Sequence, residues 1–290
     1  MDPALPAELE REIFEISALS SPKYIPNLLL VAHHVKVWTE PFLFRSLSIV
    51  SNNNYLGAAS EDAIRIASQK FVKLLDQKPA CFFQDRVRSL VLSGLEDGIV
   101  ARILSLCTRV SHLALFGIST EPAWLSMIAE MPLLEISSSI DGFFTPLGVD
   151  FHHPLFNTLS HLDLFEAPAS AGWVDVLCSL PRLTHLSFNS DTSLENVSFR
   201  EILAKGTSLQ VLVLVVGSIQ EIESEDYPFS EYRYFADDCR SVIMLVEDCL
   251  RDWEIGAIGG ENYWIRAQNF IQKRRSGEIQ AWQYVVRGTG

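Results

Sequence analysis

The sequence has few basic residues, few cysteines and no long hydrophobic run. Lys and Arg total 23 against 36 Asp and Glu, and the net charge of −13 argues against nucleic acid, because phosphate binding needs a basic surface. The longest apolar run, residues 209–216, is too short to cross a bilayer, and residues 1–20 lack a signal-peptide pattern. We therefore expect a soluble protein of the cytoplasm or nucleus, without a membrane partner.

Motifs for metal binding and catalysis are also missing. The five cysteines form no CxxC pair, and their odd number and apolar neighbours lead us to expect buried, reduced thiols, which fits an intracellular chain. No GxSxG, HExxH, GxGxxG or P-loop occurs. We therefore expect no enzyme activity, no cofactor, no metal and no catalytic residue, although an active site need not be local in sequence.

A short frame, apolar-x-x-apolar-x-apolar, recurs along the middle of the chain. Successive frames begin 23 to 26 residues apart, within the range of leucine-rich repeats. The frames are Val87-Leu90-Leu92, Val110-Leu113-Leu115, a degenerate Leu133-Ile136-Ser138, Leu159-Leu162-Leu164, Leu183-Leu186-Phe188 and Leu209-Leu212-Leu214. Each frame predicts a strand whose fourth and sixth residues face the core, and apolar residues at helical spacing follow several of them.

The expected fold is α/β: a leucine-rich-repeat solenoid with a curved parallel sheet and helices on its convex side. Residues 137–156 break the pattern, since they lack a helical stretch. Four phenylalanines there are expected to fill the core, although a long irregular segment can also be a binding loop. They are Phe143, Phe144, Phe151 and Phe156.

The first fifty residues have a different pattern. Pro6 and the acidic residues after it suit a helix start, and Leu9, Ile13 and Ile16 then share one helical face. Residues 25–38 also fit a helix, and Pro41 begins a third short helix or turn. Because a segment this short builds little core of its own, we expect it to dock on a partner.

This segment resembles an F-box. The resemblance rests on Leu5-Pro6-x-Glu8-Leu9, Ile13-Phe14, Leu30-Val31, His33-His34 and Trp38. F-box modules are three-helix hooks that bind the Skp-type adaptor of a cullin–RING ubiquitin ligase. The resemblance implies adaptor contacts by Leu5, Pro6, Leu9, Ile13, Phe14, Leu30, Val31 and Trp38.

The whole chain is similar to small F-box/leucine-rich-repeat proteins that are numerous in mushroom-forming fungi. The resemblance implies a substrate-recognition adaptor of an SCF-type ligase, whose repeats bind a protein substrate. The alternatives are an N-terminal cap on the first repeat, an independent binding module, or an enzyme with a site on the concave face.

The expected organisation is an F-box-like segment at 1–50, a connecting helix and linker at 51–86, and repeats at 87–220. Residues 221–290 are expected to hold an acidic linker, a last strand at 241–246 that caps the sheet, and an amphipathic helix. Lys273, Arg274 and Arg275 follow that helix, where cations are favourable.

A row of polar residues marks the expected concave face. His112, Glu135, His161 and His185 occupy the third position of their frames, and Asp163 occupies the fifth position of its own. A zinc site is geometrically possible between His161 and His185 on adjacent strands. Contact with a protein substrate is the favoured interpretation, and protonation of the histidines near pH 6.5 would tune it.

Overall fold

The computed structural model describes residues 5–51, 65–189, 198–218 and 234–287, which form an α/β structure around one parallel sheet. Its strands lie in the order β10-β9-β8-β7-β6-β5-β4-β3-β1-β2. They are β1 (Ser46–Val50), β2 (Arg65–Ala67), β3 (Ser89–Ser93), β4 (His112–Phe116), β5 (Glu135–Ser138), β6 (His161–Leu164), β7 (His185–Asn189), β8 (Val211–Val216), β9 (Ser241–Leu245) and β10 (Val285–Val286).

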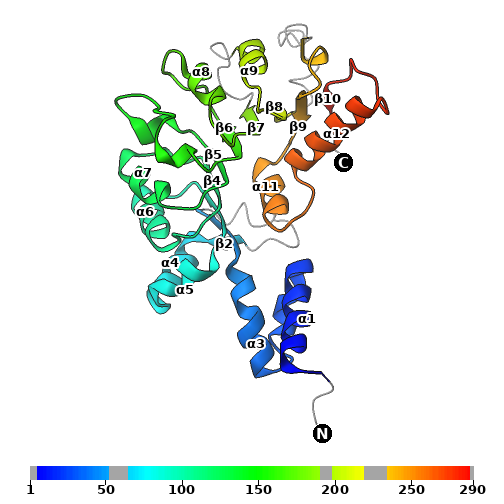
Figure 1. Cartoon of the computed structure of the whole chain (residues 1–290). Coiled ribbons are helices and arrows are strands. Elements are labelled where there is room, and N and C mark those ends of the chain that lie inside the picture. The colour runs from blue at the N-terminus through cyan, green and yellow to red at the C-terminus, as the bar shows by residue number, and fades with distance from the viewer. Residues whose placement is uncertain (1–4, 52–64, 190–197, 219–233, 288–290) are drawn as a thin grey trace.

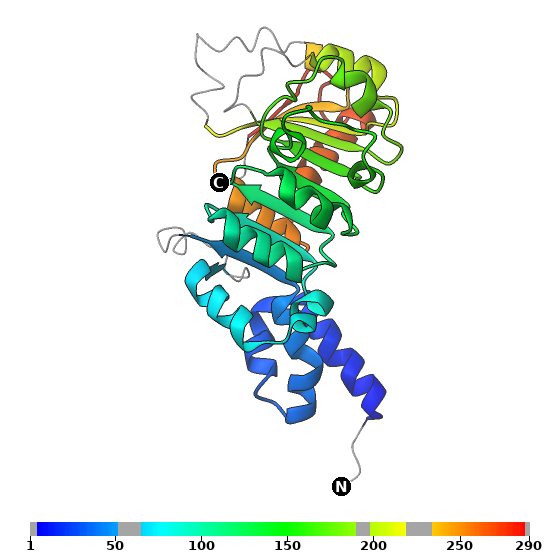
Figure 2. The ribbon, with the colours of Figure 1, turned by 90° about the vertical axis from the view of Figure 1, so that its left-hand side faces the viewer.

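Helices lie on both sides of this curved sheet (Figure 1). On the outer side are α4 (Ser68–Gln77), α5 (Ala80–Arg86), α6 (Asp97–Leu106), α7 (Pro122–Ala129), α8 (Trp173–Cys178) and α9 (Phe199–Lys205). On the inner side are α11 (Cys249–Ala257) and α12 (Tyr263–Ser276). The view in Figure 2 shows the outer helices stacked along the sheet.

The strands begin where the repeated frame predicts them. Each of β3 to β8 starts at the third residue of its frame, and the registers align equivalent frame positions, for example Leu113 with Ile136. The fourth and sixth frame residues face the outer helices and are buried there, as Leu113 and Leu115 illustrate. The alternation of side chains along each strand therefore sends one row into the main core and the other to the inner face.

The sheet extends beyond the six expected units. Residues 46–50, which were expected to belong to the N-terminal segment, form β1, and the expected linker 51–86 contains β2, α4 and α5. At the other end, β9 is followed by β10, so β9 is not the last strand as expected. The acidic run at 221–226 lies outside the described residues.

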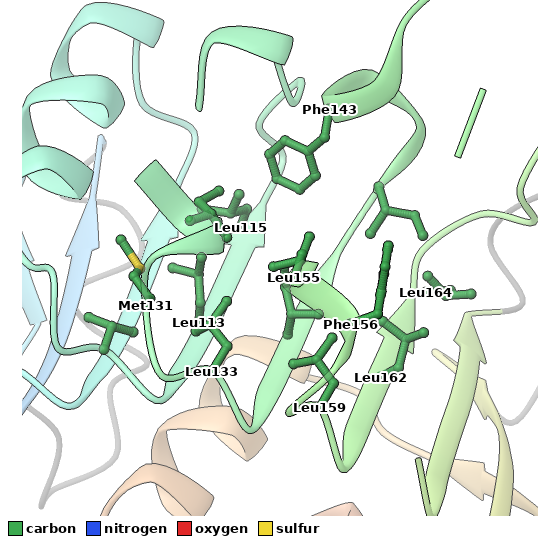
Figure 3. Close-up of a cluster of buried hydrophobic side chains, with 14 of the residues drawn as sticks. Leu113, Leu115, Met131, Leu133, Phe143, Leu155, Phe156, Leu159, Leu162 and Leu164 are labelled. Carbon is green, nitrogen blue, oxygen red and sulfur yellow. The ribbon is translucent and has the colours of Figure 1, made fainter. Parts of the chain in front are cut away.

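The irregular stretch between β5 and β6 fills the core, as the sequence predicts. It contains two short 3-10 helices, η4 (Asp141–Phe144) and η5 (Pro154–Phe156). All four phenylalanines are buried, and Phe156 stacks on Phe144 with ring centroids 5.9 Å apart. Figure 3 shows Phe143, Leu155 and Phe156 among the leucines of β4 and β6. Aromatic rings here replace a covering helix.

Residues 5–45 form an N-terminal hook that extends from one end of the sheet (Figure 1). It contains α1 (Ala7–Ser20), η1 (Pro22–Tyr24), α2 (Ile25–Leu28), α3 (His33–Thr39) and η2 (Glu40–Phe44). The prediction of a single helix over 25–38 is wrong, because Ala32 is extended (φ −161°, ψ 159°) and separates α2 from α3. Ala18, Ile25 and Val35 are buried and form the small interior of the hook.

We predict that the irregular stretch between β5 and β6 contributes directly to stability. Replacing the fully buried Phe156 with Ala removes a ring from the core, which costs about 3–5 kcal/mol of unfolding free energy in such sites. Urea denaturation measures this loss. The matched control is Leu147→Ala in the same stretch, where the side chain is 93% exposed and the change should stay within about 0.5 kcal/mol. Equal effects of the two substitutions would contradict the prediction.

Candidate functional site

Two rows of side chains face the inner side of the sheet. The first runs in register along neighbouring strands and contains Ser89, His112, Glu135, His161, His185 and Val211. The second contains Val91, Ala114, Ser137, Asp163, Ser187 and Val213. Polar residues occupy the middle strands in both rows and apolar residues the last strand, so the inner face offers two different surfaces to whatever covers it.

The C-terminal helices of the same chain cover this face. Trp253 of α11 packs on Val91 and Ala114. At the other end, α12 packs Tyr263, Trp264, Ala267 and Ile271 against valines and a methionine of β8 and β9. The amphipathic helix predicted from Trp264, Ala267, Phe270 and Ile271 is therefore confirmed, and its apolar face lies on the sheet.

Side chains near the start of α12 satisfy the polar residues of the middle strands. The Trp264 indole Nε1–H donates to Glu135 Oε1 at 3.0 Å, and Gln268 Nε2 lies 2.7 Å from His185 Nε2. Ser187 Oγ donates to Asp163 Oδ1 at 2.6 Å and forms a hydrogen bond with the Tyr263 hydroxyl, 3.0 Å away. We call these contacts the α12 lock.

The hydroxyl residue before each strand histidine sets the ring's tautomer. Ser111, Ser160 and Thr184 each place Oγ within 2.9 Å of the Nδ1 atom of the histidine that follows. Each hydroxyl also donates to a backbone carbonyl one strand away, so it accepts from Nδ1–H. In the neutral ring Nε2 is then an acceptor, which agrees with donation from Gln268 to His185.

Burial keeps these imidazoles neutral. Burial, followed by the nearby His185 and His112, lowers the pKa of His161 to about 3. Burial lowers the pKa of His185 to about 4, and the two rings stack with centroids 4.0 Å apart. Protonating either ring would place a charge under α12. Tuning of this row near pH 6.5, as expected from the sequence, is therefore wrong for His161 and His185.

The carboxyl groups of the lock are held close to protonation at neutral pH. Burial raises the pKa of Glu135 to about 7, against the lowering effect of the Trp264 hydrogen bond. Burial likewise raises the pKa of Asp163 to about 6, although Ser187, Ser137 and Tyr263 stabilise its charged form. These carboxyl groups are costly to ionise in the folded chain.

The predicted substrate surface is thus largely occupied by the chain itself. Asp163 and His185 are buried, which corrects the expectation that a partner contacts them, and the Glu135 carboxylate is bonded to Trp264. His112 and His161 stay half-buried and line openings at the inner face. Within the described residues, no three His, Cys, Asp or Glu side chains are grouped so as to hold a metal ion.

Further contacts of α11 and α12 were not evident from the sequence. Asp252 of α11 accepts hydrogen bonds from the Tyr263 backbone N–H and from Arg266 Nη2, which joins the two helices. Arg274 lies in the last turn of α12 and is buried, and its guanidinium donates to backbone carbonyls that include those of Phe235 and Ser241. It fixes the end of α12 to the region before β9.

Two cavities lie along the edge where the inner strands begin. The helix cleft, about 310 Å³, lies between His112, Glu135 and His161 on the sheet and Trp253 and Trp264 on the helices. The hook cavity, about 380 Å³, lies between the hook, the starts of β1, β3 and β4, and the end of α11. Both volumes suit small ligands or single side chains.

The hook presents apolar side chains to solvent. Of thirteen large hydrophobic side chains exposed in the described residues, nine lie between Leu5 and Val37. Among the predicted adaptor contacts, Leu5, Pro6, Leu9, Ile13, Leu30 and Val31 are exposed, and Phe14 and Trp38 are half-buried. Hydrogen bonding between His34 Nε2 and Glu10 Oε1, 3.3 Å apart, links α3 to α1.

A search of protein families and a search of curated proteins both gave no match to this chain. Among the described residues, no helix has the length and apolar character that a membrane-spanning helix requires.

We predict that Glu135 lowers the free energy of unfolding by an amount that depends on pH. Between pH 4.5 and 7 the folded chain keeps a proton on this carboxyl that the unfolded chain has lost, so its contribution to stability falls as pH rises. Glu135→Gln keeps an acceptor for Trp264 and removes the titration. The stability of E135Q relative to wild type should therefore rise by about 1–3 kcal/mol between pH 4.5 and pH 8.

Denaturant unfolding at several pH values measures this difference. Wild type and E135Q share His161 and His185, so the difference between them cancels the contribution of these histidines to the pH dependence of stability. Their lowered pKa values act in the opposite direction at acid pH. A difference that does not change with pH would contradict a raised Glu135 pKa.

Proposed function

We propose that this chain is an F-box/leucine-rich-repeat adaptor of a cullin–RING ubiquitin ligase, in which the hook binds a Skp-type adaptor protein. The observation that carries the proposal is the apolar surface of the hook. Leu9, Ile13 and Ile16 follow one another at helical spacing on α1 and are 48%, 53% and 54% exposed. Contiguous exposed apolar surface of this kind is typical of protein interaction sites.

The second part of the surface comes from the turn between α2 and α3. Leu30 is 85% exposed and Val31 is 58% exposed, although both are large aliphatic residues. The backbone N–H groups of Leu30 and Val31 donate to Asn27 and Leu28, so the turn holds these side chains outward. Their exposure favours a partner over a purely internal capping role, which would bury them against the first strands.

The repeats are proposed to recruit the substrate. Since α12 covers Asp163 and His185, the parts of the predicted substrate surface that remain open lie at the helix cleft. His112 and His161 line it, together with Leu134 and Ile265, which are exposed. A substrate segment would therefore meet the edge of the inner face rather than its centre.

Adaptor binding tests the proposal. Leu9→Ala/Ile13→Ala removes two exposed side chains whose burial at an interface is worth about 3–6 kcal/mol when fully covered. We expect wild type to bind a recombinant Skp-type adaptor and the double variant to bind at least about 100-fold more weakly, measured by titration calorimetry.

The matched control is Leu147→Ala/Trp282→Ala, which removes exposed apolar side chains outside the hook and should leave adaptor affinity unchanged. Circular dichroism checks that all variants are folded. Absence of binding by wild type would contradict the ligase role and favour an independent binding module. Equal binding by the L9A/I13A variant would contradict the placement of the interface.

A further inference from the structure

The hook cavity has a cationic side in a chain of net charge −13. Arg45, Arg88 and His112 line it, and among the described lining residues there is no Asp or Glu. The acidic residues that dominate the chain are thus absent from the lining of this cavity, and its charge is opposite to that of the protein as a whole.

The two arginines of this cavity have N–H donors that are not used within the described residues. Arg45 is exposed, and within the described part of the chain its side chain makes no hydrogen bond or ion pair. Arg88 donates from Nη1 to the Val87 carbonyl and from Nη2 to the Asp85 carbonyl, both at 2.9 Å. These bonds hold the guanidinium in place and use two of its five N–H donors.

The cations act on one another across the cavity wall. Burial, then the charges of Arg109 and Arg45, lowers the pKa of Arg88, while Asp85 opposes this. Burial and Arg45 also lower the pKa of His112. An anion placed among these groups would relieve the repulsion. The end of α11 also faces the cavity, but its dipole amounts to about half a negative charge against two guanidinium charges.

Much of the remaining wall is apolar. Leu19, Pro22 and Phe42 of the hook line it, and Ala257 and Ile258 close it from the end of α11. A ligand that fills about 380 Å³ would thus meet both apolar side chains and the two arginines. Apolar walls with a few convergent polar groups are typical of small-molecule sites.

We propose that the hook cavity binds a small amphiphilic anion, an apolar body that carries one carboxylate or phosphate group held by Arg45 and Arg88. The bound molecule touches the hook, the start of the sheet and α11 together. Binding therefore stabilises the orientation of the hook relative to the sheet. This site is independent of the proposed adaptor surface on Leu9 and Ile13.

The test uses three eight-carbon probes in titration calorimetry with the full chain: octanoate, octyl phosphate and octanol. We expect at least one of the two anions to bind one per chain and octanol to bind about tenfold more weakly or not at all, because it lacks the charge. A preference for octanoate or for octyl phosphate supports the proposal and identifies the anionic group. Equal binding of octanol, or no binding of either anion, overturns it.

Variants locate the site. Arg45→Gln should weaken anion binding about tenfold, and because Arg45 is exposed and has no side-chain partner among the described residues, the substitution should leave folding intact. Arg88→Gln should weaken binding further, with thermal unfolding as its folding check, since Arg88 also bonds to backbone carbonyls. The matched control is Arg102→Gln, on the outer helix α6, where Arg102 pairs with Asp76. Unchanged anion affinity in R45Q, or an equal loss in R102Q, overturns the proposal.

Discussion

The covering of the inner face by α11 and α12 is the constraint on which the rest of the structure depends. Parallel strands that turn polar residues toward one face need partners for them, because a buried polar group without a hydrogen bond costs about 1–3 kcal/mol. The α12 lock provides these partners from Tyr263, Trp264 and Gln268. The apolar end strands instead take the apolar side chains of the same helices.

This covering divides the molecule into internal and external surfaces. Repeat proteins with a curved sheet offer its concave face to partners, whereas α11 and α12 cover most of the inner face here. Exposed apolar side chains gather instead on the hook, with Leu9, Ile13 and Leu30 as examples. The hook cavity lies between these two regions, where Arg45 and Arg88 meet the end of α11.

Local periodicity predicted most of the sheet and most of the core. The frame that begins at Val87 recurs with a spacing that only stacked strands explain, and the phenylalanines of residues 137–156 lie in the core as expected. The strand β1 was missed, although Phe44, Leu47 and Ile49 follow the same frame. The frame that begins at Phe44 lies 43 residues before the one at Val87, and this distance hides the period because β2, α4 and α5 lie between the two frames.

The function of the histidine row could not be read from spacing alone. The sequence places His161 and His185 on one face of adjacent strands, and the register confirms this. The sequence carries no signal that Gln268, more than eighty residues after His185, lies over this row. Long-range contacts of this kind depend on where the chain returns after β9, which neither hydrophobic pattern nor motif encodes. The adaptor contacts predicted on the hook lie on its surface, and their partner is still a proposal.

The central claim, that α12 closes the inner face, is tested most directly by the imidazoles beneath it. Nuclear magnetic resonance of ¹⁵N-labelled histidine side chains reports the tautomer and the titration of each ring. If α12 covers them, His161 and His185 keep the proton on Nδ1, leave Nε2 unprotonated, and stay neutral to below about pH 5. Titration of both rings near pH 6.5, the ordinary value for histidine, would show that the face is open to water and contradict the account.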